Sequence, residues 1–220
     1  MPETTDVLTQ RSPGLPSILR KATEGTGFSR FWAIGDLKIL DNPLLGLLCS
    51  VRCPGRVIVQ SYDLARSLRD AGVPVIGGFH SPMEKECLDF LLRGKQPVVV
   101  CPARSIGNMR MPLAWRKACA EGRLLLLSPF PPKHGRISAL LAERRNKFIS
   151  LLVNQVFVPY AAPKSKTEQL CRDLLSVGKR IYTFESERES SIVKAGALTI
   201  NLDHFVAQLL RVDDSAKINC

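Results

Sequence analysis

The chain lacks the signatures of several large protein classes. It has no stretch of eighteen or more apolar residues and no secretory apolar segment, so we expect a soluble, cytoplasmic protein that does not bind a membrane. Aromatic residues make up only 6% of the chain, so extended surfaces for stacking bases are scarce. Cys49 and Cys53 have no second pair at metal-ligand spacing, so we expect no metal site.

Two nucleotide-binding motifs are also missing. No loop ends in the Gly-Lys-Ser/Thr of a Walker A sequence, and no strand is followed by three spaced glycines. We therefore expect no resident cofactor. The seven cysteines are an odd number, and most lie in apolar segments, as reduced core cysteines of a cytoplasmic protein do.

Positive charge is what the chain has in excess. Its 220 residues include 31 Lys and Arg against 20 Asp and Glu, which gives a formal net charge of +11 and a pI near 9.6. Such a charge raises the odds of a polyanionic partner. By itself it fits simple solubility about equally well.

Short apolar runs alternate with segments of helical spacing. The runs cover residues 44–49, 73–76, 97–101, 124–127, 153–158 and 180–184, and glycines follow several of the helical segments as helix-ending residues do. Strand, helix, glycine and strand in repeated order predict a parallel sheet with right-handed crossovers. The expected fold class is therefore α/β, a Rossmann-like, doubly wound and mainly parallel sheet of about six strands with helices on both faces.

The first 30 residues differ from the rest. Three prolines and scattered basic residues without a clean period predict a basic, partly mobile N-terminal arm over residues 1–30. Residues 31–220 contain no linker and predict a single Rossmann-like domain. Residues 192–197 and 202–210 are expected to close it with one or two helices.

Polar side chains follow the predicted strands, where an open α/β sheet binds its ligands. Guanidinium, ammonium and hydroxyl groups at such a crevice suit a phosphate-bearing ligand. The candidate residues are Ser50, Arg52, Gly77, Gly78, His80, Ser81, Arg104, Ser128, Lys133, Arg144, Arg145, Asn146, Lys164, Ser165, Lys166 and Thr167.

Part of this pattern has a purely structural explanation. Ser81-Pro82 with Glu84 is typical of a helix start with a capping box, which accounts for about half of the second loop but not for His80. The sequence also leaves open whether Arg145 points into the crevice or pairs with Glu143.

Several of these motifs resemble the Rossmann-like core of the DNA-processing protein A (DprA, also called Smf) family over about residues 31–198. Ser50-Val51-Arg52 is similar to its Gly-Ser-Arg sequence, residues 77–81 to its glycine loop, and Arg145-Asn146 to its Arg-Asn pair. Cys49 replaces a glycine of the family, and the chain is too short for both flanking domains of many relatives. The resemblance implies a non-catalytic protein, often dimeric, that binds single-stranded DNA in a basic pocket during DNA processing, uptake or recombination.

A related family provides the alternative. LOG-type phosphoribohydrolases, which cleave the base from nucleoside 5′-monophosphates, carry Pro-Gly-Gly-x-Gly-Thr before a catalytic Glu, and residues 163–168 are similar except that Lys164, Ser165 and Lys166 replace the glycines. That resemblance implies a nucleotide-binding enzyme, an N-glycosidic hydrolase with Glu168 as catalytic residue, or a nucleotide sensor. A first-turn helix glutamate is the structural explanation of Glu168.

Overall fold

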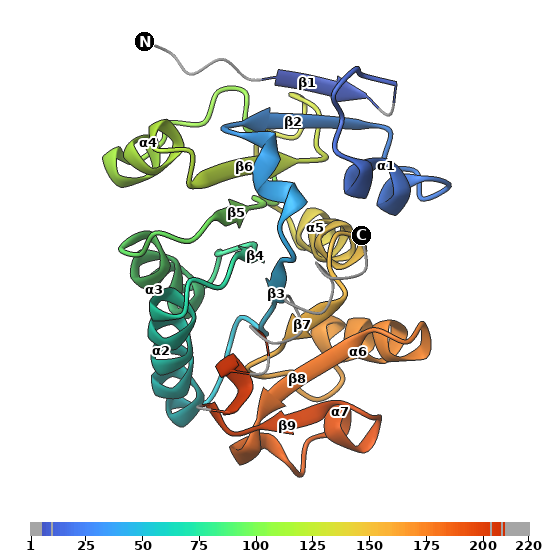
Figure 1. Ribbon diagram of the computed structural model, residues 1–220. Helices are drawn as coiled ribbons and strands as arrows, with labels where there is room; N and C mark the ends of the chain where they lie inside the picture. Colours follow the sequence, from blue (N-terminus) through green and yellow to red (C-terminus); the bar gives the residue numbers. More distant parts are fainter. Residues whose placement is uncertain (1–5, 10, 203, 208, 210–220) are drawn as a thin grey trace, which may run out of the picture.

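A nine-stranded sheet forms the centre of the protein in a computed structural model, which describes residues 6–9, 11–202, 204–207 and 209. The strands lie in the order β1-β2-β6-β5-β4-β3-β7-β8-β9 (Figure 1). Their bounds are β1 Asp6–Thr9, β2 Arg30–Ile34, β3 Leu45–Leu47, β4 Val75–Gly77, β5 Val98–Val100, β6 Leu124–Ser128, β7 Gln155–Phe157, β8 Arg180–Phe184 and β9 Leu198–Ile200.

Strand direction confirms the predicted fold class. β3 to β9 pair in parallel throughout, whereas β1 with β2 and β2 with β6 are antiparallel. The six apolar runs correspond to β3 to β8. The expected number of strands was too small, because β1, β2 and β9 were not predicted. Two of these are edge strands with few buried residues, so an apolar run does not mark them.

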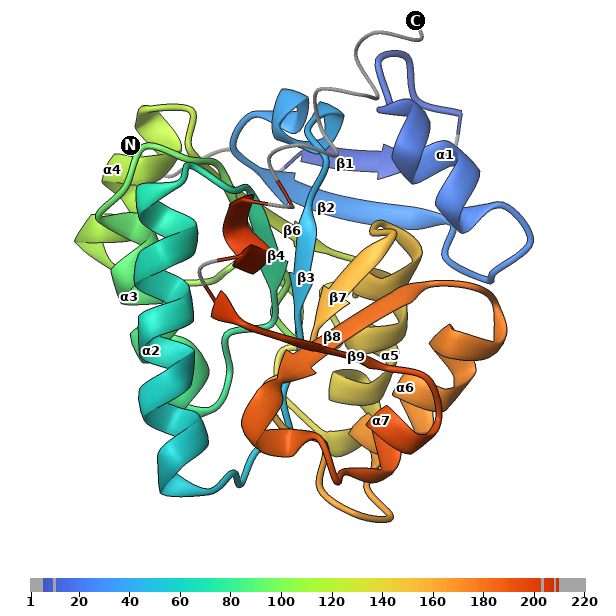
Figure 2. The same cartoon turned by 60° about the horizontal axis from the view of Figure 1, so that its bottom comes forward.

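Helices cover both faces of the sheet, as expected. α2 (Gly55–Asp70), α3 (Pro82–Leu92) and α4 (Leu113–Ala120) pack on one face, and α1 (Ser17–Thr23), α5 (Ala139–Leu151), α6 (Lys166–Ser176) and α7 (Ser191–Lys194) pack on the other (Figures 1 and 2). Adjacent residues of each strand alternate between the two cores: Leu124 and Leu126 join the first, and Leu125 and Leu127 the second. Short 3₁₀ helices at Leu37–Asp41 and Glu185–Glu187 complete the connections.

The described part of residues 1–30 contributes to the sheet and to the core. β1 extends the sheet by pairing with β2, and α1 packs Leu19 into the core at 0% exposure. Leu15 and Phe28 are buried beside it, and the Phe28 ring lies 5.3 Å from that of Phe148. The partners of these anchors are distant in sequence, as Phe148 is from Phe28, so the local pattern did not reveal the packing. Residues 1–5 and 10 lie outside the described residues.

The closing segment is partly described. Residues 202, 204–207 and 209 are helical, and the Phe205 ring lies 5.4 Å from Phe157 and 4.8 Å from Tyr182. The rest of the predicted 202–210 helix and of the expected domain lies outside the described part of the chain. These are residues 203, 208 and 210–220.

The strand order places a switch point beside β3. From β3 the chain proceeds through β4, β5 and β6 in one direction, and it then returns to add β7, β8 and β9 on the other side. After β3 the chain continues to α2 on one face of the sheet, and after β7 it continues to α6 on the other face. Open α/β sheets bind their ligands at such a switch point.

Candidate functional site

Ser50 joins the two loops of the switch point. Its backbone N–H donates to the Tyr160 carbonyl at 3.0 Å, and its hydroxyl accepts from the Ala162 N–H at 3.0 Å. The Ser50 hydroxyl also lies 3.4 Å from that of Ser165. Ser50 is only 7% exposed. Its side chain therefore fixes the loop after β7 against the loop after β3.

Two thiols lie at the same loop. A hydrogen bond from the Cys49 thiol lowers the pKa of the Cys53 thiol to about 7, against the opposing effect of burial. The same contact, with burial, raises the pKa of Cys49. Cys49 is buried and Cys53 is half-buried, so Cys53 is the accessible and acidic member of the pair.

Arg145 is a buried cation under the ends of β4 and β5. It is 5% exposed, and its Nη1 donates to the Cys101 carbonyl at 3.1 Å while its Nε donates to Asn146 Oδ1 at 2.7 Å. A Cβ on Gly78 would lie 1.5 Å from Nη1, so only glycine leaves room for the guanidinium. Burial lowers the pKa of Arg145, and the Glu84 carboxylate opposes this effect. Arg145 thus lies under the strand ends, whereas Glu143 pairs with Lys166.

The loop after β4 ends in the predicted capping box. The Glu84 N–H donates to the Ser81 hydroxyl at 3.3 Å, and the Ser81 N–H donates to the Glu84 carboxylate at 2.9 Å. The His80 N–H donates to the same carboxylate at 3.2 Å. Ser81 is buried, and His80 remains exposed. Of this loop, the His80 imidazole is thus the candidate side chain that faces solvent.

The ends of β5 and β6 are tied together in the same manner. The Ser128 hydroxyl donates to the Arg104 carbonyl at 2.8 Å and accepts from the Phe130 N–H at 3.2 Å. The Ser105 N–H donates to the His134 carbonyl at 2.9 Å. Ser128 is fully buried, whereas the Arg104 side chain is half-buried. The hydroxyl therefore shapes the loop, and the guanidinium remains for solvent or ligand.

Glu168 has a complete set of donors. Hydrogen bonds from the Ser191 hydroxyl, the Arg172 guanidinium and the Lys164 N–H lower its pKa to about 2. Its own N–H donates to the Ser165 hydroxyl, which caps α6, at 3.1 Å. Glu168 is 8% exposed. The carboxylate therefore stays ionised and holds the turn in which Lys164 adopts a φ of 58°.

The remaining candidates form a set of outward-facing basic residues, here called the rim. Their side chains are exposed, except for half-buried Arg104. Of these basic residues only Lys166 makes an ion pair within the described part of the chain, at 3.5 Å from Glu143. Both groups are exposed, so the pair adds little stability. The rim consists of Arg52, His80, Arg104, Lys133, Arg144, Lys164 and Lys166.

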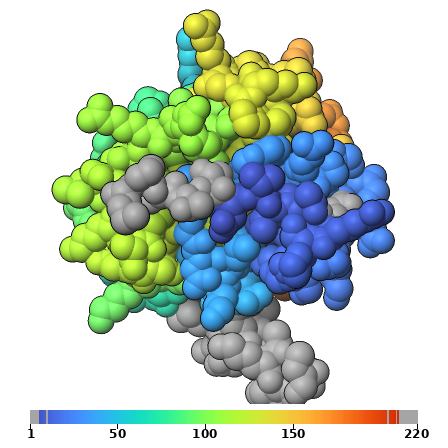
Figure 3. Space-filling model, turned by 90° about the horizontal axis from the view of Figure 1, so that it is seen from above, coloured from blue at the N-terminus to red at the C-terminus, as the bar shows by residue number. Residues whose placement is uncertain are grey.

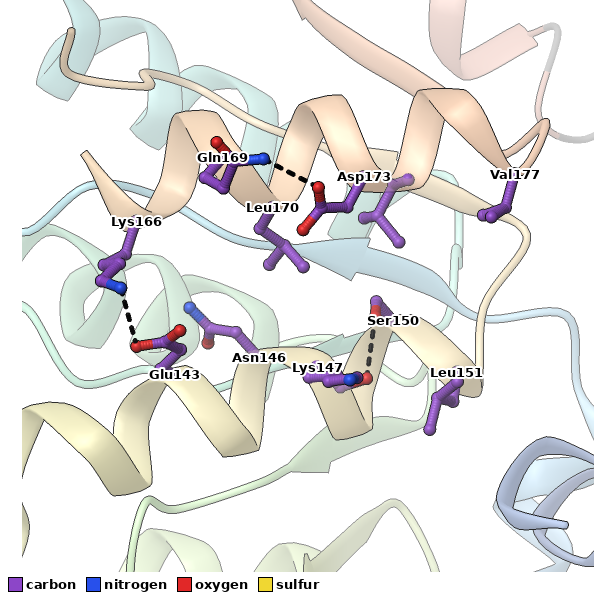
Figure 4. Close-up of a pocket in the computed structure, with 11 residues that line it drawn as sticks. Glu143, Asn146, Lys147, Ser150, Leu151, Lys166, Gln169, Leu170, Asp173 and Val177 are labelled. Atoms are coloured by element: carbon purple, nitrogen blue, oxygen red, sulfur yellow. Dashed lines mark hydrogen bonds and ion pairs between the residues drawn. The ribbon is translucent and has the colours of Figure 1, made fainter. Parts of the chain in front are cut away.

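A groove between α5 and α6 lies beside the rim (Figure 4). It encloses about 360 Å³, and Asn146 lines it together with the Lys166–Glu143 pair. Lys147 and Asp173 add one charge of each sign. Thr167, by contrast, is buried at the start of α6. Because its charges are mixed, the groove offers no net attraction for a polyanion.

Two basic residues of the strand-end surface were not among the predicted site residues. Arg30 begins β2, and His134 lies in the proline-rich loop after β6; both line a pocket with Lys133 and Arg144. Arg30 is the last residue of the predicted N-terminal arm. In the sequence, the apolar residues 31–34 that follow Arg30 were the signal that Arg30 begins a buried strand.

Among the residues that the structure describes, no three His, Cys, Asp or Glu side chains come together as metal ligands. In the same part of the chain, no helix combines the length and the apolar character needed to cross a bilayer.

Solved structures with the same arrangement include two DNA processing proteins. DNA processing protein A (DprA) from Streptococcus pneumoniae superposes with a TM-score of 0.73 at 14% identity, over 90% of this chain and 71% of that chain. DprA from Helicobacter pylori, described for its single-stranded DNA binding mode, gives 0.72 at 17% identity over 96% and 98%. The chain has the fold of DprA.

The DprA likeness confirms the resemblance seen in the sequence, at the level of fold. The molybdenum cofactor binding protein from Rippkaea orientalis is a more distant neighbour, with a TM-score of 0.54 at 9% identity over 78% of this chain and 97% of that chain. No protein-family model and no curated protein sequence matches the chain.

Proposed function

We propose that this protein binds single-stranded DNA through its phosphates, along the carboxyl ends of the central strands. The observation that carries the proposal is the rim, because six of its seven basic side chains make no ion pair within the described residues. Guanidinium and ammonium groups without carboxylate partners are free to neutralise phosphates. The net charge of +11 acts in the same direction.

The buried polar groups have a supporting role in this proposal. Ser50, Ser81 and Ser128 already hydrogen-bond within the protein, and Arg145 supports the ends of β4 and β5. They hold the loops so that the rim residues project from fixed positions, which reduces the entropy lost on binding. The likeness to a DprA that binds single-stranded DNA favours that ligand over duplex DNA. A dimer, a cytoplasmic location and a role in DNA recombination are further parts of the proposal that the same likeness suggests.

A hydrolytic role for Glu168 has less support. A general base works best with a pKa near the working pH, and three donors hold the pKa of Glu168 at about 2. If the protein were a phosphoribohydrolase, incubation with AMP or GMP would release free base, and Glu168→Gln would abolish that release. Under the DNA-binding proposal no base is released and Glu168→Gln changes DNA affinity little.

Fluorescence anisotropy with a labelled oligothymidylate tests the proposal. Affinity should fall as salt rises, by about 0.7 log units per log unit of salt for each phosphate neutralised on a single strand. AMP and GMP should compete weakly. A salt slope near zero, or full displacement by micromolar mononucleotide, contradicts the proposal.

A pair of double variants locates the site. Arg52→Gln with Lys164→Gln removes two rim charges and should weaken binding about tenfold or more while reducing the salt slope. Arg116→Gln with Lys194→Gln removes the same charge from exposed positions on α4 and α7 and serves as the matched control. Equal losses in the two variants would show that net charge, not the rim, determines affinity.

A further inference from the structure

The pocket noted at Arg30 lies at one corner of the strand-end surface and is here called the corner pocket. β2 runs antiparallel to β6, with Trp32 opposite Ser128, so the start of β2 lies beside the end of β6. Phe28, Arg30 and Trp32 contribute from one side and Lys133 and His134 from the loop after β6, around a volume of about 400 Å³. Figure 3, seen from above the view of Figure 1, shows the blue N-terminal segments beside the yellow atoms of the segment that leads into α5.

Four basic residues line the corner pocket, and none of the described residues that line it carries a carboxylate. Arg30, Lys133 and Arg144 make no ion pair within the described ranges of the chain. The Arg144 guanidinium lies 5.8 Å from the centre of the Phe28 ring, which orients it without neutralising it. This contrasts with the α5–α6 groove, where lysines and carboxylates are mixed.

The wall that carries Lys133 and His134 is held in place. The His134 N–H donates to the Pro131 carbonyl at 2.9 Å, and the His134 carbonyl accepts from the Ser105 N–H at 2.9 Å. The imidazole packs edge-on against the buried Phe130 ring, with 6.2 Å between centroids. Prolines at 129, 131 and 132 limit the backbone further. The basic side chains of this wall therefore project from a preorganised loop.

We propose that the corner pocket is a second phosphate subsite, which takes the phosphate of a nucleotide. Two guanidinium groups and an ammonium group match the oxygens of a phosphate. The volume is within the range of small-ligand sites. Trp32 and Phe28 line the pocket as largely buried side chains, so Trp32 can report on what binds there.

The role of the corner pocket in DNA binding rests on the proposed function and extends it. β3 and β6 are three strands apart in the sheet, which corresponds to about 14 Å at about 4.8 Å per strand. A mononucleotide is too small to occupy the switch point and the corner pocket together. A strand of several nucleotides can reach both, so affinity should rise with strand length until both are filled.

A tryptophan reporter tests the subsite without relying on DNA binding. The chain has two tryptophans, so Trp115→Phe leaves Trp32, in the wall of the pocket, as the only one. Titration with dAMP, with deoxyadenosine and with 5′-phosphorylated oligothymidylates of two and twelve nucleotides should change Trp32 fluorescence only where a phosphate is present. In the same background, Lys133→Gln with Arg144→Gln should raise the ligand concentration needed for half of the fluorescence change about tenfold or more. Arg116→Gln with Lys194→Gln should leave that concentration unchanged.

The outcomes separate this inference from the proposed function. A response to dAMP without twelve-mer binding keeps the pocket as a mononucleotide site and contradicts the DNA proposal. A response to oligonucleotides alone assigns the phosphate to a DNA strand. Strong twelve-mer binding with no Trp32 response, or a response to deoxyadenosine equal to that to dAMP, overturns the subsite. Equal responses in the two double variants overturn it as well, because both side chains changed in the pocket are exposed and their loss should leave the fold intact.

Discussion

Polar residues at the strand ends fall into two regions with opposite properties. The inner region, which contains Ser50, Ser128 and Arg145, is buried and hydrogen-bonded within the protein. The rim is exposed and almost without ion pairs in the described part of the chain. Buried polar groups that lose a partner cost stability, whereas exposed charges contribute little to it. The inner region should therefore determine folding, and the rim should determine binding.

Gly78→Ala should destabilise the inner region. The new Cβ would overlap the Arg145 guanidinium, whose Nη1 lies 1.5 Å from that position, and the buried side chain has little space to move. We expect the free energy of unfolding to fall by about 1–3 kcal/mol, the usual cost of overpacking. Urea denaturation measures the change. Gly107→Ala is the control, because the nearest atom to its Cβ would be 4.0 Å away. Equal stability of the two variants would mean that Arg145 is not held against Gly78.

Adjacent residues of α5 show what the sequence could predict. Leu141, Arg145, Phe148 and Ile149 form the buried face of α5. The helical periodicity is compatible with this face, but the sequence left open whether Arg145 points inward or pairs with Glu143. It did not reveal the carbonyl that Arg145 binds, because Cys101 is 44 residues away in sequence. The positions of polar residues at strand ends followed from the βα alternation alone. Their division into inner region and rim depends on long-range contacts and was not predictable.

Burial also explains which strands could be predicted from the sequence. Strands that are buried on both faces appear as apolar runs, and β3 to β8 were found in this way. Exposed edge strands such as β1 and β9 have no such run. The packing of α1 depends on Phe28 and Leu19 meeting α5 and the sheet, a contact between the first and third quarters of the chain.

Acid unfolding tests whether buried Glu168 stabilises the fold, as the other buried polar groups are expected to do. Its pKa is lowered from 4.5 to about 2, so its contribution to stability is present above pH 4.5 and is lost as the pH falls from 4.5 to 2. Glu168→Gln should therefore melt at a lower temperature at pH 7 and lose less on acidification. Thermal denaturation monitored by circular dichroism between pH 2 and 7 measures both. Glu189→Gln, at a side chain 87% exposed, should behave as the wild type; identical profiles for both variants would contradict the account.

The smallest expected effect is on the reactivity of Cys53, which is neither fully buried like the inner region nor exposed like the rim. Its thiol is half-buried with a pKa of about 7, whereas burial raises the pKa of Cys87, Cys101 and Cys171 to about 12. Alkylation of Cys53 by iodoacetamide should rise through pH 7 and exceed that of the three buried cysteines, as peptide mass spectrometry would show. Cys49→Ser keeps a donor and should change the profile less than Cys49→Ala. A rate at Cys53 no higher than at Cys87 would contradict this assignment.

The most direct test of the division compares the neighbours Arg144 and Arg145. Each is replaced by Gln, and both the free energy of unfolding and the affinity for single-stranded DNA are measured. Arg144→Gln should weaken DNA binding several-fold and leave stability within about 0.5 kcal/mol of the wild type. Arg145→Gln should lower stability by about 2–4 kcal/mol, because a buried guanidinium is lost and the Cys101 carbonyl is left without its donor. Unchanged DNA affinity in Arg144→Gln, or unchanged stability in Arg145→Gln, would contradict the account.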